Sequence, residues 1–512
     1  MKIVPNGESA VAASPERNAE DSEEPPGPAT RTKLARRTVS QTRNRVPDLS
    51  SPALSAETET DSSRHRNFPV EEFWRRIPAY RDVDRATFLD HNWQNRNAVI
   101  NPARLRATVG DLLSDGFYAD VERGLERVPM SVRIPPYIIA QIDWNDPEHD
   151  PLRRQYLPLD SALIPDHPRL TLDSLGEQND AKAPGLTHRY NDKALFLALK
   201  TCPLYCRFCT RSYAVGLDTD RVKKVQLSAE FSRWQQAFDY IRATPQIEDI
   251  VISGGDTLML KPEQIRLIGE TLLDIPHVRR MRFATRGPAI LPMKLLTDDL
   301  WFGALAHVVN LGRRQMKEVV VHTHFNHPNE ATWITYLAMQ RMFEAGITVR
   351  NQSVLLRGVN DDADTMRTLL KRLSYMNVHP YYVFQHDLVK GVEDLRTPVS
   401  RTIELEKQMR GSTAGFNTPT FVVDLPGGGG KRDVHSYEYY DPTTGVSVYR
   451  SPNIDAHRLY LYFDPIHLLP PEGRARWADP AQHETMVLEA LSAAERNLLA
   501  DSHLLALDAR KA

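Results

Sequence analysis

The stretch ALFLALKTCPLYCRFCTR, residues 194–211, joins a short apolar segment to all three cysteines of the chain. Residues 194–200 are apolar enough to form a buried strand, and Cys202, Cys206 and Cys209 follow it directly in a CxxxCxxC pattern. No other cysteine occurs in the 512 residues. An odd number of cysteines in one tight cluster does not predict a disulfide framework, and it favours a metal site in a reducing compartment.

The same arrangement, an apolar run that ends in polar residues, recurs along the chain. The apolar runs are 194–200, 249–253, 279–285, 317–323, 346–356 and 378–385. Helical patterns separate them, and strands that alternate with helices predict βαβ units and a parallel sheet. Because no GxGxxG fingerprint is present, we expect an α/β fold with a partial (β/α)6-type barrel rather than a dinucleotide-binding sheet. The polar strand ends would then meet at one rim, where barrel active sites lie.

The composition excludes several classes of protein. The chain is 41% hydrophobic and 25% charged, with a formal net charge of −2, which gives no electrostatic reason to expect nucleic acid or a membrane as partner. No apolar stretch approaches the roughly 20 residues that a membrane-spanning helix needs, and no secretory signal is evident. We therefore expect a cytoplasmic protein.

The chain divides into four regions by composition. Residues 1–67 are rich in Ser, Pro, Glu and Arg and predict a disordered tail, in which 31–45 carries six basic residues and no acidic ones. A targeting or docking arm is the alternative interpretation of that stretch. Residues 68–190 predict a helical and wrapping region, 191–430 the barrel, and 431–512 a lysine segment followed by a C-terminal extension.

The three cysteines allow more than one interpretation. Three thiolates can hold three irons of a [4Fe–4S] cluster and leave the fourth iron open for another ligand. Zinc with His188 as a fourth ligand is an alternative, although the usual second CxxC pair is absent. Plain buried cysteines are disfavoured because Arg207, Thr210 and Arg211 make the loop polar.

Seven motifs together resemble one family. They are APGLTHRY, CPLYCRFCTR, SGGD, THFNHPNE, NQSVLLRGVN, DLRTPVS and PTFVVDLPGGGGK. In this order they are similar to the PLP-dependent aminomutases of the radical S-adenosylmethionine (SAM) superfamily, and most closely to the lysine 2,3-aminomutase family. The likeness covers about residues 85–450, which is most of the chain outside the predicted tail.

The resemblance implies a cluster site and a SAM site. Cys202, Cys206 and Cys209 would bind the [4Fe–4S] cluster, and SAM would bind its open iron. The residues implied in SAM binding are Ser253, Gly254, Gly255, Asp256 and Gln352. The glycines would let the backbone approach the ligand closely.

The resemblance also implies a PLP site. DLPGGGGK, residues 424–431, is the motif that carries the PLP lysine in the family, so Lys431 would bond the cofactor covalently. Taken alone, the motif would be a flexible linker that ends in a surface lysine. Arg189 and Tyr190 follow as PLP contacts, with Arg189 on the phosphate. Lys193 replaces a second arginine of the family, which removes the bidentate fork.

The implied activity is that of an isomerase, which moves the α-amino group of L-lysine to C3 and gives β-lysine. Arg211 would bind the substrate carboxylate, and Asp387 and Asp424 would pair with the ε-ammonium. Two carboxylates also suit a guanidinium, so the same chemistry on arginine or another amino acid is an alternative. Phe384 stands where the nearest family members have tyrosine.

The family also implies partners and one difference. A flavodoxin- or ferredoxin-like electron donor and a homo-oligomer are expected. Some family members hold a structural zinc through further cysteines, but here every cysteine belongs to the cluster motif, and Asp362 lies where one ligand would be. We therefore expect no structural zinc. A non-catalytic metal-binding barrel is the alternative of another class.

Overall fold

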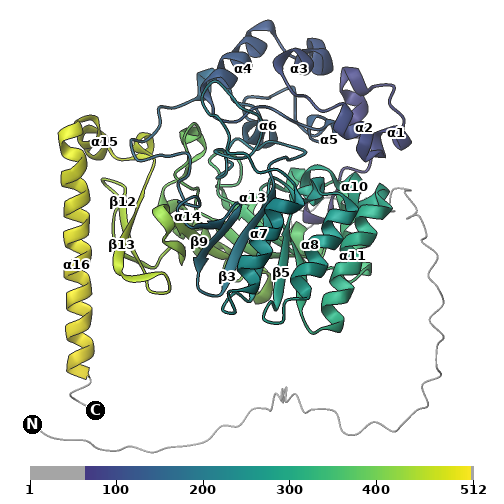
Figure 1. Ribbon diagram of the computed structural model, residues 1–512. Coiled ribbons are helices and arrows are strands. Elements are labelled where there is room, and N and C mark those ends of the chain that lie inside the picture. Colours follow the sequence, from purple (N-terminus) through teal and green to yellow (C-terminus); the bar gives the residue numbers. More distant parts are fainter. Residues whose placement is uncertain (1–63, 509–512) are drawn as a thin grey trace, which may run out of the picture. The chain divides into compact units, whose positions relative to one another are not determined.

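The computed structural model describes residues 64–508, with side chains to residue 500. Most of the predicted disordered tail, residues 1–67, lies outside this range, as does the basic stretch 31–45. Within the described range the chain has a mixed α/β fold, with a ten-stranded sheet and a separate three-stranded sheet (Figure 1). No helix of this range is both long and apolar enough to cross a membrane.

The large sheet is mostly parallel. Its parallel strands are neighbours in chain order: β3 (Lys193–Leu199), β4 (Asp249–Gly254), β5 (Arg280–Ala284), β6 (Glu318–Thr323), β7 (Val349–Val354), β8 (Val378–Phe384) and β9 (Thr420–Leu425). The six predicted strands correspond to β3 to β8, which confirms the parallel sheet. The seventh parallel strand, β9, is not among the predicted strands, because its short FVVDL run directly precedes the glycine motif.

Antiparallel strands extend the sheet at both edges. They are β1 (Ala181–Ala183) and β2 (Leu186–Tyr190) on one side and β10 (Gly430–Asp433) on the other. No pairing in the described residues joins β1 to β10, so the sheet is open. The two edges of the sheet nevertheless approach each other. The Lys431 N–H on β10 donates to the Tyr190 hydroxyl on β2 at 2.7 Å, so the sheet is curled.

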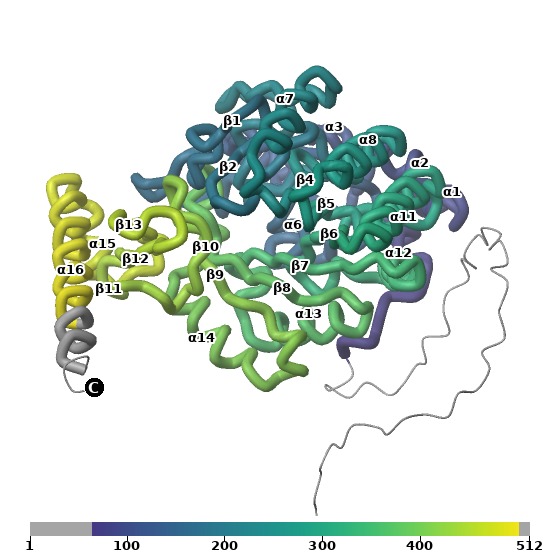
Figure 2. Tube along the Cα trace, turned by 60° about the horizontal axis from the view of Figure 1, so that its bottom comes forward, coloured from purple at the N-terminus to yellow at the C-terminus, as the bar shows by residue number. Residues whose placement is uncertain are grey.

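Helices cover the apolar face of the sheet. They are α7 (Phe231–Arg242), α8 (Pro262–Leu273), α9 (Gly287–Ile290), α10 (Pro292–Thr297), α11 (Asp299–Arg314), α12 (Trp333–Glu344), α13 (Ala363–Tyr375) and α14 (Val399–Met409). Figure 2 shows α7, α8, α11, α12 and α13 along the outer side of the strands. On β5, Met281 and Phe283 are buried, whereas Arg280 and Arg282 are only partly buried. The inner face of the sheet, opposite the helices, therefore carries polar residues at β5.

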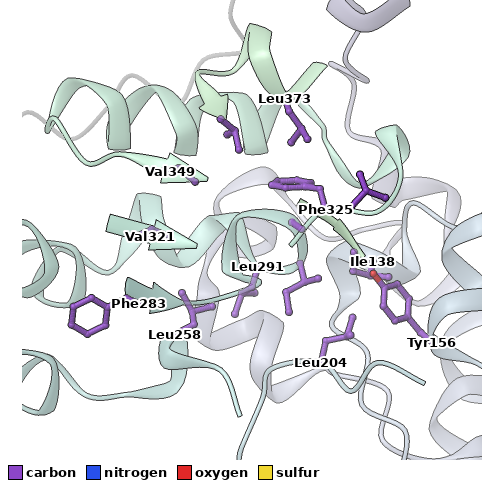
Figure 3. Close-up of a cluster of buried hydrophobic side chains, with 14 of the residues drawn as sticks. Ile138, Tyr156, Leu204, Leu258, Phe283, Leu291, Val321, Phe325, Val349 and Leu373 are labelled. Carbon is purple, nitrogen blue, oxygen red and sulfur yellow. The ribbon is translucent and has the colours of Figure 1, made fainter. Parts of the chain in front are cut away.

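The N-terminal helices share the core of the sheet. They are α1 (Arg85–Leu89), α2 (His91–Arg96), α3 (Pro102–Val109), α4 (Asp115–Arg127), α5 (Pro136–Ile139) and α6 (Pro151–Tyr156). In Figure 3, Ile138 and Tyr156 of this region lie close to Leu204 of the cysteine loop and Phe325. This shared core fixes the cysteine loop against the N-terminal region.

The C-terminal sheet contacts the end of β8. It consists of β11 (Tyr437–Asp441), β12 (Val446–Ser451) and β13 (Asp455–Phe463), followed by α15 (Pro471–Ala478) and α16 (His483–Asp508). The Tyr462 hydroxyl donates to the His386 carbonyl at 2.7 Å and accepts from the Gln385 amide at 2.8 Å. The extension thus supports the strand end that carries Asp387.

Candidate active site

The cysteine loop leaves the carboxyl end of β3, as the sequence predicted. The three sulfurs are partly buried, with Cys202 and Cys209 packed beside Tyr205 and Cys206 beside Phe208. Burial raises the pKa of all three thiols, that of Cys209 to about 11. A bound cation is what would keep such buried sulfurs ionised.

His188, the alternative fourth ligand for zinc, has other partners in the structure. Among the described residues, no group of three His, Cys, Asp or Glu is arranged to hold one ion. Zinc would draw three sulfurs close together, because each Zn–S bond is about 2.3 Å long. His188, the alternative zinc ligand, instead contacts the Tyr240 hydroxyl at 2.9 Å and the Asn191 carbonyl at 3.3 Å.

Arg286 is a residue of this site that sequence analysis missed. It follows β5 in the motif TRGP, and its side chain is only 8% exposed. The guanidinium donates to the Cys206 sulfur at 2.7 Å, to the Gln155 amide oxygen at 2.9 Å and to the Glu330 carboxylate at 2.5 Å. A buried cation beside the sulfurs favours thiolates. The sequence signal was present, since Arg286 lies at a strand end, but nothing specified its partners.

The SGGD motif ends β4 beside the entry to the cysteine loop. A Cβ on Gly254 would lie 2.1 Å from the Leu199 carbonyl oxygen, and one on Gly255 would lie 2.2 Å from that of Thr201. Glycine is therefore required by close packing against the chain that leads to Cys202, a different reason from the expected approach to a ligand. The SAM contacts predicted for Ser253, Gly254 and Gly255 stay a prediction.

Two further predicted SAM residues have partners within the protein. The Asp256 carboxylate accepts from the Leu258 and Arg286 backbone N–H groups, both at 2.8 Å. It thereby ties the end of β4 to the end of β5. The Gln352 amide lies 3.1 Å from His322 Nδ1 on the inner face of the sheet. Their contacts with SAM also stay a prediction.

Lys431 lies opposite Asp424 in the β9–β10 pair. Its Nζ is 2.8 Å from Asp424 Oδ2 and 5.4 Å from the centre of the Phe384 ring. Burial lowers the pKa of Lys431, but Asp424 and Tyr190 outweigh burial and raise it above its ordinary value. The side chain remains 35% exposed, so a small molecule can reach it.

Asp387 and Asp424 form an incompletely satisfied pair. In the part of the chain that the structure describes, the Oδ1 atom of each is buried and has no hydrogen-bond partner. Burial and the nearby Asp424 carboxylate raise the pKa of Asp387 well above its ordinary value. Two buried carboxylates with spare acceptor atoms are suited to binding a cation.

Two predicted anion-binding arginines are held by one short segment, residues 173–180. Arg189 donates to Asp180 at 2.7 Å, and Arg211 forms a two-pronged contact with Glu177 at 2.9 and 3.0 Å. The Tyr213 hydroxyl also donates to Glu177, at 2.8 Å. Glu177 was missed, because it lies in a proline-rich stretch without a recognisable motif.

The same segment supports the glycine loop. The Gly427 N–H donates to the Ser174 carbonyl at 2.8 Å, and a Cβ on Gly428 would lie 3.5 Å from Asp180. The 173–180 segment therefore brings the two arginines and the loop before Lys431 together. Arg211 is the predicted ligand of the substrate carboxylate, Arg189 that of the PLP phosphate, and Lys431 at the end of the loop is the residue predicted to bond the PLP aldehyde.

Two positions at which the chain differs from the family have local roles. The Asp362 carboxylate caps α13 by accepting from the Asp364 and Thr365 N–H groups, at 3.1 and 2.8 Å. The Lys193 ammonium lies 3.0 Å from Asp192 and 4.9 Å from the centre of the Tyr190 ring. Lys193 is therefore on the same side as the predicted PLP contacts.

Comparison with known proteins identifies the family. No protein-family model matches the chain. The L-lysine 2,3-aminomutase of Clostridium subterminale is 40% identical over 363 residues, which are 70% of this chain and 81% of the relative. The L-lysine 2,3-aminomutase of Bacillus subtilis is 35% identical over 72% of this chain and 73% of the relative. The glutamate 2,3-aminomutase of Clostridioides difficile is 34% identical over 58% and 66%. The chain therefore belongs to the lysine 2,3-aminomutase family of radical SAM aminomutases, which are isomerases.

Proposed function

We propose that the chain is an L-lysine 2,3-aminomutase that moves the α-amino group from C2 to C3 and gives β-lysine. The observation that carries the proposal is the pair Asp387 and Asp424, whose buried Oδ1 atoms have no partner among the described residues. A distal ammonium group would satisfy both. The glutamate-specific relative acts on an amino acid whose distal carboxylate such a pair would repel.

The residues present fit the three implied cofactors. Cys202, Cys206 and Cys209 would hold a [4Fe–4S] cluster, because all three cysteines lie on one loop and Cys206 contacts the buried Arg286. The end of β4 and Gln352 would contact SAM. When bound, cluster, SAM and PLP together supply a hydrogen-abstracting radical and a conjugated system that delocalises an unpaired electron. Reduction of the cluster would need a flavodoxin- or ferredoxin-like donor.

The protein's own residues would bind and orient the substrate and PLP. Lys431 would hold PLP at the exposed end of β10, with Arg189 near its phosphate. Arg211 offers a planar fork for the substrate carboxylate once Glu177 yields it. With the carboxylate at Arg211 and the ammonium at the aspartate pair, the α-carbon is fixed between two charged anchors.

The curl of the ten-stranded sheet supports the further proposal that it is a partial barrel of the radical SAM type. The Tyr190–Lys431 contact joins β2 to β10 across the inner face. Polar strand ends from β3, β4, β5 and β8 carry the proposed site.

Anaerobic reconstitution followed by product analysis tests the proposal. The protein is loaded with iron, sulfide and PLP and incubated with SAM, a reductant and L-lysine, L-arginine or L-glutamate in parallel. We expect about four irons and four sulfides per chain and β-lysine as the main product. Zinc at one per chain without sulfide would overturn the cluster. A fully loaded protein that forms a β-amino acid from arginine or glutamate but not from lysine would overturn the substrate.

Asp387→Asn and Asp424→Asn sharpen the test. Each variant removes one negative charge from the pair while nearly keeping its shape. We expect either change to raise the KM for lysine at least tenfold, because a buried ammonium loses a charged partner. Asp433→Asn is the matched control, since Asp433 lies exposed on the same strand as Lys431.

A further inference from the structure

Lys431 already has a charged partner in the cofactor-free chain. Lys431 and Asp424 are directly opposite each other in the antiparallel pair β9–β10, and Nζ lies 2.8 Å from Oδ2. Opposite charges at such cross-strand positions attract each other. The Lys431 backbone N–H is held by the Tyr190 hydroxyl at 2.7 Å. The residue is thus fixed at its backbone and at its ammonium group.

Acidic and phenolic groups around Lys431 favour its ammonium form, whereas two cations near the glycine loop and Tyr190, Arg189 and Lys193, oppose it. Asp387, which follows β8, and Tyr190 on β2 both favour the ammonium form, as Asp424 on β9 does. The Phe384 ring, 5.4 Å from Nζ, also favours a cation over its face. Only Asp424 makes a direct contact with Nζ among these groups, so its charge dominates.

A protonated lysine cannot bond to an aldehyde. Attachment joins the amine nitrogen to the aldehyde carbon as a double bond, and the aldehyde oxygen leaves as water with the two amine hydrogens. Only the neutral amine has the electron pair that begins this step. The contact with Asp424 therefore opposes the reaction that the proposed function requires of Lys431.

We propose that Asp424 is a positioning residue that holds Lys431 as an ammonium ion in the cofactor-free chain and sets the pH above which PLP attaches. The inference rests on the proposed function, in which Lys431 is the residue that bonds PLP. Asp424 would then bind two ammonium groups in succession, first that of Lys431 and later the distal ammonium of the substrate. Once Lys431 carries the cofactor, its ammonium no longer occupies Asp424, and the carboxylate becomes available to the distal ammonium of the substrate.

The rate of PLP attachment measured against pH tests the inference. Full-length protein without PLP is mixed with PLP between pH 6 and 10, and the absorbance band of lysine-bound PLP is followed. The variants are Asp424→Asn, Asp387→Asn and Asp433→Asn, with Lys431→Ala to show which lysine reacts. Asp424→Glu restores the carboxylate, and thermal unfolding of each variant checks the fold.

We expect Asp424→Asn to attach PLP about tenfold faster at pH 7, with the midpoint of the rate profile lowered by about one pH unit. Asp387→Asn should shift the profile less, Asp433→Asn should follow the wild type, and Asp424→Glu should return the profile to it. An Asp424→Asn profile that coincides with the wild type in a folded protein would overturn the inference. Undiminished PLP attachment in Lys431→Ala would instead overturn the proposed role of Lys431, so the two failures are distinguishable.

Discussion

Arg286 beside the cysteine loop and the aspartate pair beside the glycine loop belong to neighbouring parts of one proposed site, yet their hydrogen-bonding capacity is used to different extents. Around Cys206, Arg286 is buried and each of its three guanidinium nitrogens has a protein partner. Around Lys431, the Asp387 and Asp424 Oδ1 atoms are buried without a partner in the described residues. Arg286 is thus a satisfied part of the framework around Cys206, whereas the aspartate pair has acceptor atoms to spare. Ligand-binding capacity is expected where polar groups are unsatisfied.

The largest effect on stability should come from Arg286→Leu. The change leaves the fully buried Glu330 carboxylate without its cation, and breaking a buried pair costs roughly 3–5 kcal/mol. Denaturant unfolding of the anaerobic protein measures this loss. A cost below about 1 kcal/mol would show that the region around the cysteines is not the rigid framework that the comparison requires.

A pair of glycine substitutions compares the two loops directly. In Gly255→Ala the new Cβ would lie 2.2 Å from the Thr201 carbonyl oxygen, so we expect a loss of about 1–3 kcal/mol from overpacking. In Gly427→Ala the nearest atom is 3.6 Å away, and only the positive φ of 67° opposes the change, at about 1 kcal/mol. Equal unfolding free energies for the two variants would remove the distinction between the loops.

The free energy of unfolding should fall at acidic pH because His386, next to Asp387, is buried. Burial lowers the pKa of His386 to about 4, whereas an unfolded histidine titrates near 6.5. Below about pH 6.5 the unfolded chain takes up a proton that the folded chain excludes, so stability falls as pH falls towards 4. The effect reaches about 1.4 kcal/mol per pH unit and is absent above pH 6.5.

Chemical unfolding of wild type and His386→Asn between pH 4 and 8 measures this difference. The wild type should lose stability relative to the variant only on the acid side. A difference that stays constant over the whole range would show that His386 takes up its proton equally readily in the folded and the unfolded protein.

The smallest effect on stability should come from Lys431→Ala. The Lys431 side chain is 35% exposed, so solvent screens its ion pair, but its removal leaves the buried Asp424 carboxylate without a cation. We therefore expect a loss of about 1 kcal/mol, well below that of Arg286→Leu. The same variant should lose the PLP absorbance band completely. Strong destabilisation would instead show that Lys431 stabilises the fold, as Arg286 is expected to do, and would contradict the comparison.

Sequence patterns predicted the parallel sheet. They also predicted many of the site residues, because these residues lie at the ends of the predicted strands. The six apolar runs became β3 to β8, and Cys202, Asp256 and Asp387 lie at or just after three of their carboxyl ends. The seventh parallel strand, β9, was missed because its short apolar run precedes four glycines. A short strand of this kind is recognised only by its pairing partners, here β8 and β10.

The residues that sequence analysis could not assign act through long-range contacts. Glu177 binds Arg211, 34 positions away, and Arg286 reaches Cys206, 80 positions away. No local pattern encodes such a pair, because the fold decides which side chains meet. The need for glycine in SGGD could not be predicted either, because it arises from the close approach of the Leu199 and Thr201 backbone to Gly254 and Gly255.

The migration of nitrogen itself is the central claim, and a labelled substrate tests it most directly. L-Lysine with ¹⁵N at the α position is incubated with the reconstituted protein, SAM and a reductant under anaerobic conditions, and the product is analysed by NMR. The account predicts β-lysine with ¹⁵N bonded to C3 and none at C2 or in free ammonium. Recovery of the label only at C2 or as ammonium, from protein that carries both iron–sulfur cluster and PLP, would contradict it.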